Sequence, residues 1–249
     1  MTPPSQPVAH GARAAGSSSP TQLRAVFFDA GNTLFFEKPS RFEIYAAAAR
    51  DLGLGVAGDD VRRAMLAEHD RLPAVDGEAV RYTDRWFRAY VPAVFRSLGA
   101  GPDRLEGFAD ELLQRFRRTA RFHLFPETLE VLDALRARGV RTAIVSNWSA
   151  RLAKHLDDLD LTRRFDAVLI SAVEGLEKPD RALFARALER LGVEPGEAIH
   201  VGDHPVKDVE GARAAGLRAL LVDREASTAG GTDAIPSLRP ILTIVGERP

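Results

Sequence analysis

The chain has 249 residues, of which 45% are hydrophobic and 28% are charged, as in an ordinary water-soluble globular protein. A formal net charge of −1 gives no long-range attraction to nucleic acid or to an anionic membrane, and no apolar run is long enough to span a bilayer. Because the chain has no cysteine, disulfides, a thiol nucleophile and thiolate metal ligands are excluded.

The first segment, residues 1–22, is rich in proline, alanine, serine and glycine. It lacks the apolar stretch that a secretory signal peptide needs. We therefore expect a flexible tail in front of the folded chain, and a cytoplasmic protein.

A short apolar run at 24–29 predicts the first strand, which ends at Asp29 and is followed by Ala-Gly-Asn-Thr. The long segment 38–122 then shows apolar residues at helical spacing, enough for four helices, with Pro92 expected to kink the third. This pattern predicts an all-helical cap domain inserted after the first strand and lying above the strand ends.

From residue 123 onward, short apolar runs alternate with segments of helical periodicity, which is the pattern of a parallel sheet covered by helices on both faces. The sequence therefore predicts an α/β fold: a doubly wound, Rossmann-like core made of residues 23–37 and 123–249. The further strands are expected at 141–145, 166–170, 198–202 and 218–222. Helices are expected at 126–138, at 180–191 and from Pro205 to just before Gly216.

Polar residues follow these strands at the point where each one ends. Asp29 follows the first, Ser146 and Asn147 the second, and Asp203 the fourth, while a loop after the third reaches Lys178. Because the carboxyl ends of parallel strands meet at one edge of the sheet, we expect these side chains to converge. Carboxylates, a hydroxyl, an amide and an ammonium together can bind a divalent metal and a phosphate, and can carry out phosphoryl transfer.

The four motifs Asp29-Ala30-Gly31-Asn32-Thr33, Ser146-Asn147, Lys178-Pro179 and Gly202-Asp203 with Asp208 resemble those of the haloacid dehalogenase superfamily. The helical insertion after the first motif is similar to its subfamily I, and the Asp-Ala-Gly-x-Thr motif to one branch of it. Most members of that superfamily are magnesium-dependent phosphatases in which the first aspartate is the nucleophile.

The resemblance implies a Mg²⁺ site and a covalent mechanism. Asp29 would attack phosphorus and form an aspartyl phosphate that water later hydrolyses. Asp29, the backbone carbonyl of Gly31, and Asp203 would supply oxygen ligands to the metal, with Asp208 as a further ligand or as an anchor for the ligands.

The remaining motif residues are expected to hold the substrate, a small phosphorylated molecule. Lys178 would neutralise charge on the nucleophile and on the transferring group. Ser146 and the backbone around Asn147 would bind phosphate oxygens. Thr33 would orient Asp29 through a hydrogen bond and lie at the phosphate side of the site.

Each of these residues also has an interpretation without function. Ser146 and Asn147 fit the N-cap of a helix after residue 148. Lys178 fits a solvated loop lysine, although only four lysines occur in the chain. Asp203 fits a turn, and Asp208 fits an acid in the first turn of a helix.

The chain departs from the phosphatase pattern at Gly31, where such enzymes carry a second aspartate as general acid and base. General acid–base catalysis contributes about 10²–10⁴-fold, so its loss is severe for alkyl phosphates and mild for acyl phosphates. A replacement acid could come from His204, Glu37, the cap or the substrate. Gly31→Asp is expected to raise the turnover of alkyl phosphates if the missing acid limits the rate.

Two further functions stay open at the level of sequence. Relatives that act as 2-haloacid dehalogenases also lack the second aspartate, but they need no metal, which fits poorly with Asp203 and Asp208. A non-catalytic protein of the same fold, binding phosphate or metal without turnover, is the other. Neither the substrate nor the choice between monomer and homodimer follows from the sequence.

Overall fold

The computed structural model describes residues 22–225 and 233–246. The tail expected at 1–22 therefore lies outside the described residues, except for Gln22. Within the described ranges, no helix is long and apolar enough to cross a membrane.

The core is a six-stranded sheet in the order β5-β4-β1-β6-β7-β8, with all neighbours parallel. Its strands are β1 (Ala25–Phe28), β4 (Arg141–Ser146), β5 (Ala167–Ile170), β6 (Ala198–Gly202), β7 (Arg218–Val222) and β8 (Ala234–Ile235). The five predicted strands are confirmed, and the two-residue β8 was not predicted. After β1 the chain adds β4 and β5 on one side of it and then β6, β7 and β8 on the other. A crevice for a ligand is expected at the carboxyl end of β1, where the strand order reverses.

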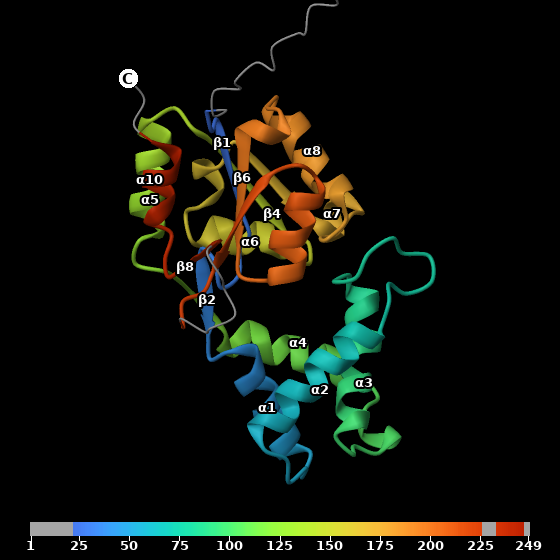
Figure 1. Cartoon of the computed structure of the whole chain (residues 1–249). Helices are drawn as coiled ribbons and strands as arrows, with labels where there is room; N and C mark the ends of the chain where they lie inside the picture. The colour runs from blue at the N-terminus through green and yellow to red at the C-terminus, as the bar shows by residue number, and fades with distance from the viewer. Residues whose placement is uncertain (1–21, 226–232, 247–249) are drawn as a thin grey trace, which may run out of the picture.

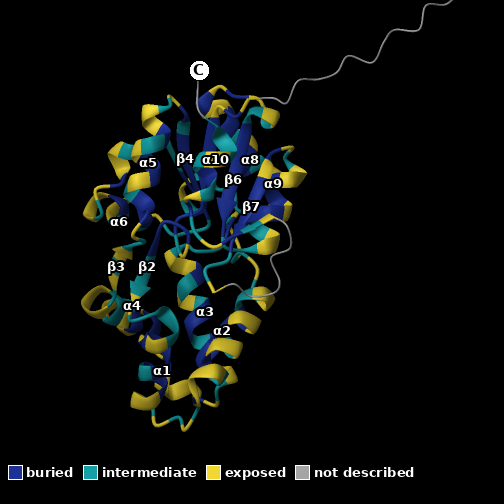
Figure 2. Cartoon of the chain, turned by 60° about the vertical axis from the view of Figure 1, so that its left-hand side comes forward, coloured by how far each residue is buried: buried dark blue, intermediate teal, exposed yellow. Residues whose placement is uncertain are grey.

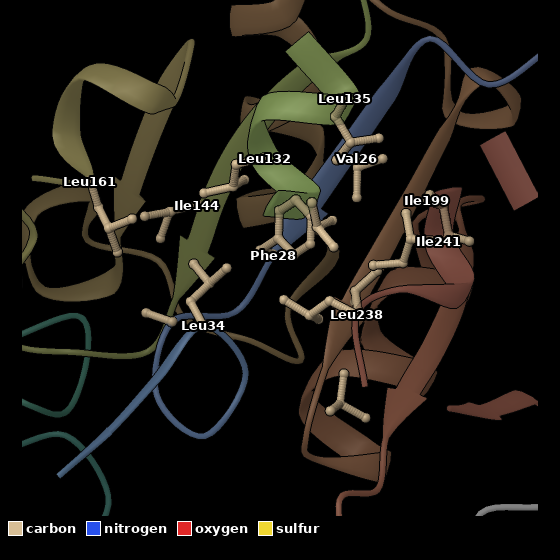
Figure 3. Packing of buried hydrophobic residues seen from close by; sticks show 14 of the residues in the cluster. Val26, Phe28, Leu34, Leu132, Leu135, Ile144, Leu161, Ile199, Leu238 and Ile241 are labelled. Carbon is tan, nitrogen blue, oxygen red and sulfur yellow. The ribbon is translucent and has the colours of Figure 1, made fainter. Parts of the chain in front are cut away.

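The two faces of the sheet are packed separately, as the apolar runs predicted. In β1, Val26 and Phe28 point to one face, and Ala25 and Phe27 to the other, because side chains alternate along a strand. The first face is covered by α5 (Thr128–Ala137), α6 (Leu152–Asp158) and α10 (Pro240–Val245). Figure 1 shows α5 and α10 side by side, and Figure 3 shows residues of these two helices close to Val26 and Phe28. The second is covered by α8 (Arg181–Leu191) and α9 (Gly211–Ala214).

The helix predicted from Pro205 is real but is not a uniform α-helix. It begins as the π-helix η4 (Pro205–Glu210) and continues as α9. In the π-helical part, which starts just after Asp203, each hydrogen bond spans one residue more than in an α-helix. The shorter elements of the core are α7 (Ser171–Glu174) and the 3₁₀ turns η2 (Thr162–Arg164) and η3 (Pro195–Glu197).

The segment between β1 and β4 forms a helical insertion, defined here as residues 41–119. It contains α1 (Arg41–Asp51), α2 (Gly58–Arg71), α3 (Asp84–Ser97), η1 (Pro102–Arg104) and α4 (Phe108–Thr119). These helices enclose a hydrophobic cluster of their own, and Figure 2 shows their buried residues facing inward. Pro92 lies inside α3, which continues past it to Ser97.

An antiparallel ribbon leads into and out of the helical insertion. It pairs β2 (Phe35–Lys38) with β3 (Arg121–Leu124). The sequence did not predict it, because each strand has four residues and its partner lies more than 80 residues away. Figure 1 shows the helical insertion beyond the edge of the sheet at which β1 ends.

Candidate active site

Lys178 is the centre of a buried polar network at the carboxyl edge of the sheet. Its ammonium group is 1% exposed and donates to Oδ1 of Asp29, at 2.7 Å, and to Oδ1 of Asp208, at 2.5 Å. Oδ1 of Asp208 also accepts a hydrogen bond from His200 Nε2, at 2.8 Å, and Oδ2 of Asp208 accepts one from the backbone N–H of His204. A buried lysine with two carboxylate partners is not a solvated loop lysine.

The pKa values follow from this arrangement. Burial alone would lower the pKa of Lys178, but the charges of Asp208 and Asp29 outweigh it and raise that pKa. Burial would raise the pKa of Asp208, but Lys178 and His200 outweigh it and lower that pKa. Burial lowers the pKa of His200, which therefore stays neutral with its proton on Nε2. The ammonium of Lys178 and the carboxylate of Asp208 are thus both ionised at neutral pH.

Three carboxylates face one another at this point. Ligand oxygens of Asp29, Asp203 and Asp208 all lie within 4.8 Å of one another. Burial and the charges of the other two carboxylates raise the pKa of Asp203 to about 7. When Asp203 has lost its proton, Lys178 supplies one positive charge against three carboxylates, and the net charge of −2 matches that of a divalent cation in magnitude. The donor set therefore fits a hard cation such as Mg²⁺, which prefers carboxylate oxygens.

Two neighbours hold the carboxylates in place. A Cβ atom on Gly202 would lie only 2.2 Å from Cγ of Asp208, so glycine is required for the close approach of that side chain. Asn32 has φ 56°, a left-handed conformation that asparagine tolerates, and its Nδ2 donates to Oδ2 of Asp203 at 3.2 Å.

Ser146 and Asn147 have different roles in the structure. Ser146 is 1% exposed at the end of β4, and its hydroxyl has no hydrogen-bond partner within the described ranges, which leaves it available to a ligand. The side chain of Asn147 instead forms two hydrogen bonds with the backbone of Lys178. Its Nδ2 donates to the carbonyl oxygen of Lys178, at 2.8 Å, and its Oδ1 accepts from the N–H of Lys178, at 2.7 Å. Neither residue is a helix N-cap, because α6 begins only at Leu152.

The expected hydrogen bond from Thr33 to Asp29 is absent. Thr33 is fully buried, and its hydroxyl is a buried atom without a partner in the described part of the chain. Its backbone carbonyl accepts a hydrogen bond from Arg224 Nη2, at 2.8 Å, and Arg224 in turn pairs with the buried Glu127. Packing and the arginine, rather than the threonine hydroxyl, hold the loop after Asp29.

The structure disfavours the two replacement acids that were named from the sequence. Nδ1 of His204 accepts hydrogen bonds from the backbone N–H groups of Val206 and Lys207, which makes this ring the N-cap of η4. Burial also lowers its pKa, so it is a neutral imidazole. The carboxylate of Glu37 accepts both from Nε of Arg41, at 2.6 Å, and from the backbone N–H of the same residue.

Trp148 is a residue of the site that sequence reasoning missed. Its indole lies against Gly31 and packs on the ring of Phe35, with a centroid distance of 5.7 Å. The guanidinium carbon of Arg41, at the start of α1, lies 5.7 Å from the centroid of the indole. The signal for it was adjacency to Ser146 and Asn147, but nothing in the sequence placed it beside residue 31.

The helical insertion also reaches this edge of the core. Nε of Arg81 donates to Oε1 of Glu177, the residue before Lys178, at 2.9 Å. Tyr82, with φ 66°, pairs through its hydroxyl with Nε2 of His69, at 2.7 Å. Burial raises the pKa of Tyr82 to about 12.

Comparison with known proteins agrees with this geometry. Residues 23–216 match the family described as haloacid dehalogenase-like hydrolase. The chain belongs to that family. It is 40% identical over 144 residues to phosphoserine phosphatase from Thermus thermophilus, which covers 56% of this chain and 57% of that protein.

Solved structures of the family support the fold over nearly the whole chain. A HAD phosphatase from Thermococcus onnurineus has 26% identity and a TM-score of 0.63, covering 91% of this chain and 100% of that one. A 2-haloacid dehalogenase from Pseudomonas syringae has 26% identity and a TM-score of 0.61, covering 90% of this chain and 97% of that one. Because both activities occur among similar proteins, the choice between them depends on the residues of the site.

Proposed function

We propose that the protein is a Mg²⁺-dependent phosphohydrolase that acts on a small phosphorylated molecule through an aspartyl phosphate on Asp29. The observation that supports this most strongly is the group of three carboxylates around a single buried lysine. With Asp203 ionised, the three carboxylates, the nucleophile Asp29 among them, exceed the charge of Lys178 by two, so a cation is needed before a phosphate can approach. Membership of the family and 40% identity over 144 residues to a phosphoserine phosphatase also support a phosphatase reaction.

Asp29 is the nucleophile in this proposal. One of its oxygens forms a bond to phosphorus, while the bond from phosphorus to the leaving oxygen breaks and its electron pair stays with the leaving group. Water then attacks the phosphorus of the aspartyl phosphate, and the carboxylate of Asp29 is released with inorganic phosphate. This division replaces one difficult step by two easier ones.

In this proposal the other side chains of the site orient the nucleophile and the phosphate and neutralise their charge. Lys178 spans Asp29 and Asp208, so it fixes the nucleophile and balances charge that builds up on the transferring group. Ser146 offers a free hydroxyl to a phosphate oxygen. The three carboxylates, with the carbonyl of Gly31, would hold the Mg²⁺ ion, which supplies charge neutralisation between the carboxylates and the phosphate when bound.

An activity series with matched variants tests the proposal. Acetyl phosphate and an aryl phosphate are incubated with the protein in the presence of Mg²⁺ or of a chelator. Hydrolysis is expected with Mg²⁺ alone and is expected to be lost in Asp29→Asn. Asp158→Asn is the matched control, because Asp158 also pairs with a lysine but lies in an exposed pair with Lys154. Hydrolysis that survives both the chelator and Asp29→Asn would rule the mechanism out.

Dehalogenation is a second candidate because Gly31 replaces the acid and a dehalogenase is structurally similar. Displacement of a halide gains nothing from a cation bound at the nucleophile, whereas the three carboxylates are arranged to hold one. Release of chloride from 2-chloropropionate would support dehalogenation, and its absence together with phosphate hydrolysis supports the phosphatase. Stabilisation by phosphate without any turnover would instead indicate a binding protein.

A further inference from the structure

The glycine at position 31 is imposed by a neighbouring side chain and not by its own backbone. Gly31 is not among the residues with positive φ, so its main chain would accept a side chain. A Cβ atom built on it would lie 2.7 Å from Cζ3 of Trp148 and 3.3 Å from Cη2. Contacts as short as the first are essentially never seen for real Cβ atoms. The indole therefore fills the space that any side chain at residue 31 would occupy.

The indole and the backbone of Trp148 both have partners, so a movement of this residue away from Gly31 would cost free energy. Its ring packs at a tilted angle on Phe35, at 5.7 Å between centroids, and edge-to-face on Phe122, at 6.1 Å. Its backbone N–H donates to Oγ of Ser171, at 3.0 Å, and its carbonyl accepts from the backbone N–H of Ala172, at 3.2 Å. Moving the ring would lose both aromatic contacts, which are favourable beyond the area that they bury.

The indole has contacts both with the loop after Asp29 and with the helical insertion. In-line displacement requires the leaving oxygen to depart on the side of phosphorus opposite to the nucleophile. Asp29 emerges from the end of β1, so the leaving group points away from the core and toward the helical insertion. Trp148 contacts Gly31, two residues after Asp29, and its ring also lies against the guanidinium of Arg41 at the start of α1 in the helical insertion.

The charged residue that lies against the indole, Arg41, is paired with Glu37. Partial burial lowers the pKa of the Arg41 guanidinium, but its pair with Glu37 outweighs this and raises that pKa, so Arg41 keeps its proton. The carboxylate of Glu37 is occupied by that same arginine. The leaving group therefore meets an apolar ring and a permanent cation.

We propose that Trp148 sets the substrate class of the enzyme. Its indole is the surface on which the leaving group packs, and by excluding a proton donor from residue 31 it restricts turnover to phosphates whose leaving group departs as a weakly basic anion. Aryl, enol and acyl phosphates have this property, and the flat ones stack on the ring. This inference rests on the phosphohydrolase activity proposed above.

A four-protein comparison tests it: the natural protein, Trp148→Ala, Gly31→Asp and the double variant. Each is assayed with Mg²⁺ on aryl phosphates of graded leaving-group pKa and on glycerol phosphate as the alkyl ester. The double variant is expected to hydrolyse glycerol phosphate at least tenfold faster than the natural protein and either single variant, because the ring no longer excludes the new carboxyl group. Its rate should also depend less steeply on leaving-group pKa. Trp148→Ala alone should raise KM for the aryl phosphates at least threefold more than KM for acetyl phosphate.

Thermal unfolding tests the packing without any assay of activity. Gly31→Ala should lower Tm in the natural background and leave it unchanged in the Trp148→Ala background. Gly55→Ala is the matched control, since a Cβ there meets nothing within 4 Å, and it should leave Tm unchanged in both.

The outcomes separate this inference from the function on which it rests. If aryl phosphates are hydrolysed but the double variant gains nothing on glycerol phosphate, or if Gly31→Ala costs the same in both backgrounds, the role of Trp148 is refuted and the phosphohydrolase stands. If no phosphate is hydrolysed by any of the proteins, the proposed function falls, and the substrate role of Trp148 falls with it.

Discussion

The two sides of the site are built differently. On the core side, Lys178, Asp208 and His200 are buried and bonded to one another, so their positions are fixed by the sheet and by η4. On the side of the helical insertion, Arg41 is half exposed and its nearest partners are a carboxylate and an indole. In the mechanism proposed above, the buried core side carries out the reaction, and the residues facing the helical insertion select the substrate.

The largest effect is expected from breaking the core side at Lys178. Lys178→Met leaves Asp29 and Asp208 buried without a counter-charge, and loss of one partner of a buried ion pair costs about 3–5 kcal/mol. Hydrolysis should also fall by about 10²–10³-fold, as for other groups that stabilise charge in the transition state. Urea unfolding and aryl phosphate hydrolysis measure the two effects.

Lys154→Met is the control for that comparison. Lys154 and Asp158 have the same chemistry, but their side chains are 76% and 56% exposed, so the pair is worth at most about 1 kcal/mol. Equal stability and activity in the two methionine variants would show that burial does not distinguish the lysines.

Asp203 tests the charge balance of the core side. Because its folded-state pKa is raised from 3.8 to about 7, ionisation of Asp203 removes stability as the pH rises through this interval in the metal-free protein. Asp203→Asn should therefore have an equal or higher Tm than the natural protein at pH 8 without metal. It should also lose the rise in Tm that Mg²⁺ gives the natural protein. An unchanged Mg²⁺ response in scanning calorimetry would remove Asp203 from the metal site.

Most of the core side was predictable from the sequence, for a physical reason. Continuous apolar runs predicted five of the six strands, and parallel strands end at a common edge, so the residues after them had to converge. That these residues lie close together does not determine which side chains form hydrogen bonds with one another, however. The clamp from Asn147 to Lys178 and the loss of the expected Thr33 hydrogen bond depend on rotamers that no periodicity encodes.

The helical side was predictable only as a set of helices. Its periodicity indicated α1 to α4, but the ribbon of β2 and β3 and the contact of Arg81 with Glu177 join residues far apart in the sequence. The clash that excludes Asp from residue 31 likewise involves Trp148, more than 100 positions away, so the expected gain from Gly31→Asp alone must be corrected. The single substitution lacks the space that its side chain needs.

The pH dependence of stability probes His69 in the helical insertion. Burial, together with the charges of Lys207 and Arg81, lowers its pKa from 6.5 to about 4. Protonation is therefore easier in the unfolded chain, and the stability that this residue contributes is complete above pH 6.5 and is lost as the pH falls through 4. His69→Gln keeps a hydrogen-bonding group near Tyr82 but does not titrate, so its urea-unfolding curve should depend less on pH between 6.5 and 4; an unchanged slope would contradict this assignment.

The smallest effect is expected where the helical insertion is tied to the core. Arg81 and Glu177 are 17% and 21% exposed, whereas Arg151 and Asp84, which also join the two parts, are 28% and 59% exposed. Arg81→Ala should cost about 1 kcal/mol and raise KM a few-fold, because Glu177 precedes Lys178. Arg151→Ala should change KM less than twofold. A larger KM effect from Arg151 would reverse the ranking.

Trapping of the covalent intermediate tests the central claim most directly. The protein is mixed with acetyl phosphate and Mg²⁺, quenched in acid within one turnover, digested and examined by mass spectrometry. The peptide that carries Asp29 should gain the mass of one phosphoryl group, and this gain should be absent with chelator and in Asp29→Asn. Hydrolysis of acetyl phosphate with no phosphoryl group on Asp29 at any quench time, or with the group on another residue, would contradict the proposed role of Asp29.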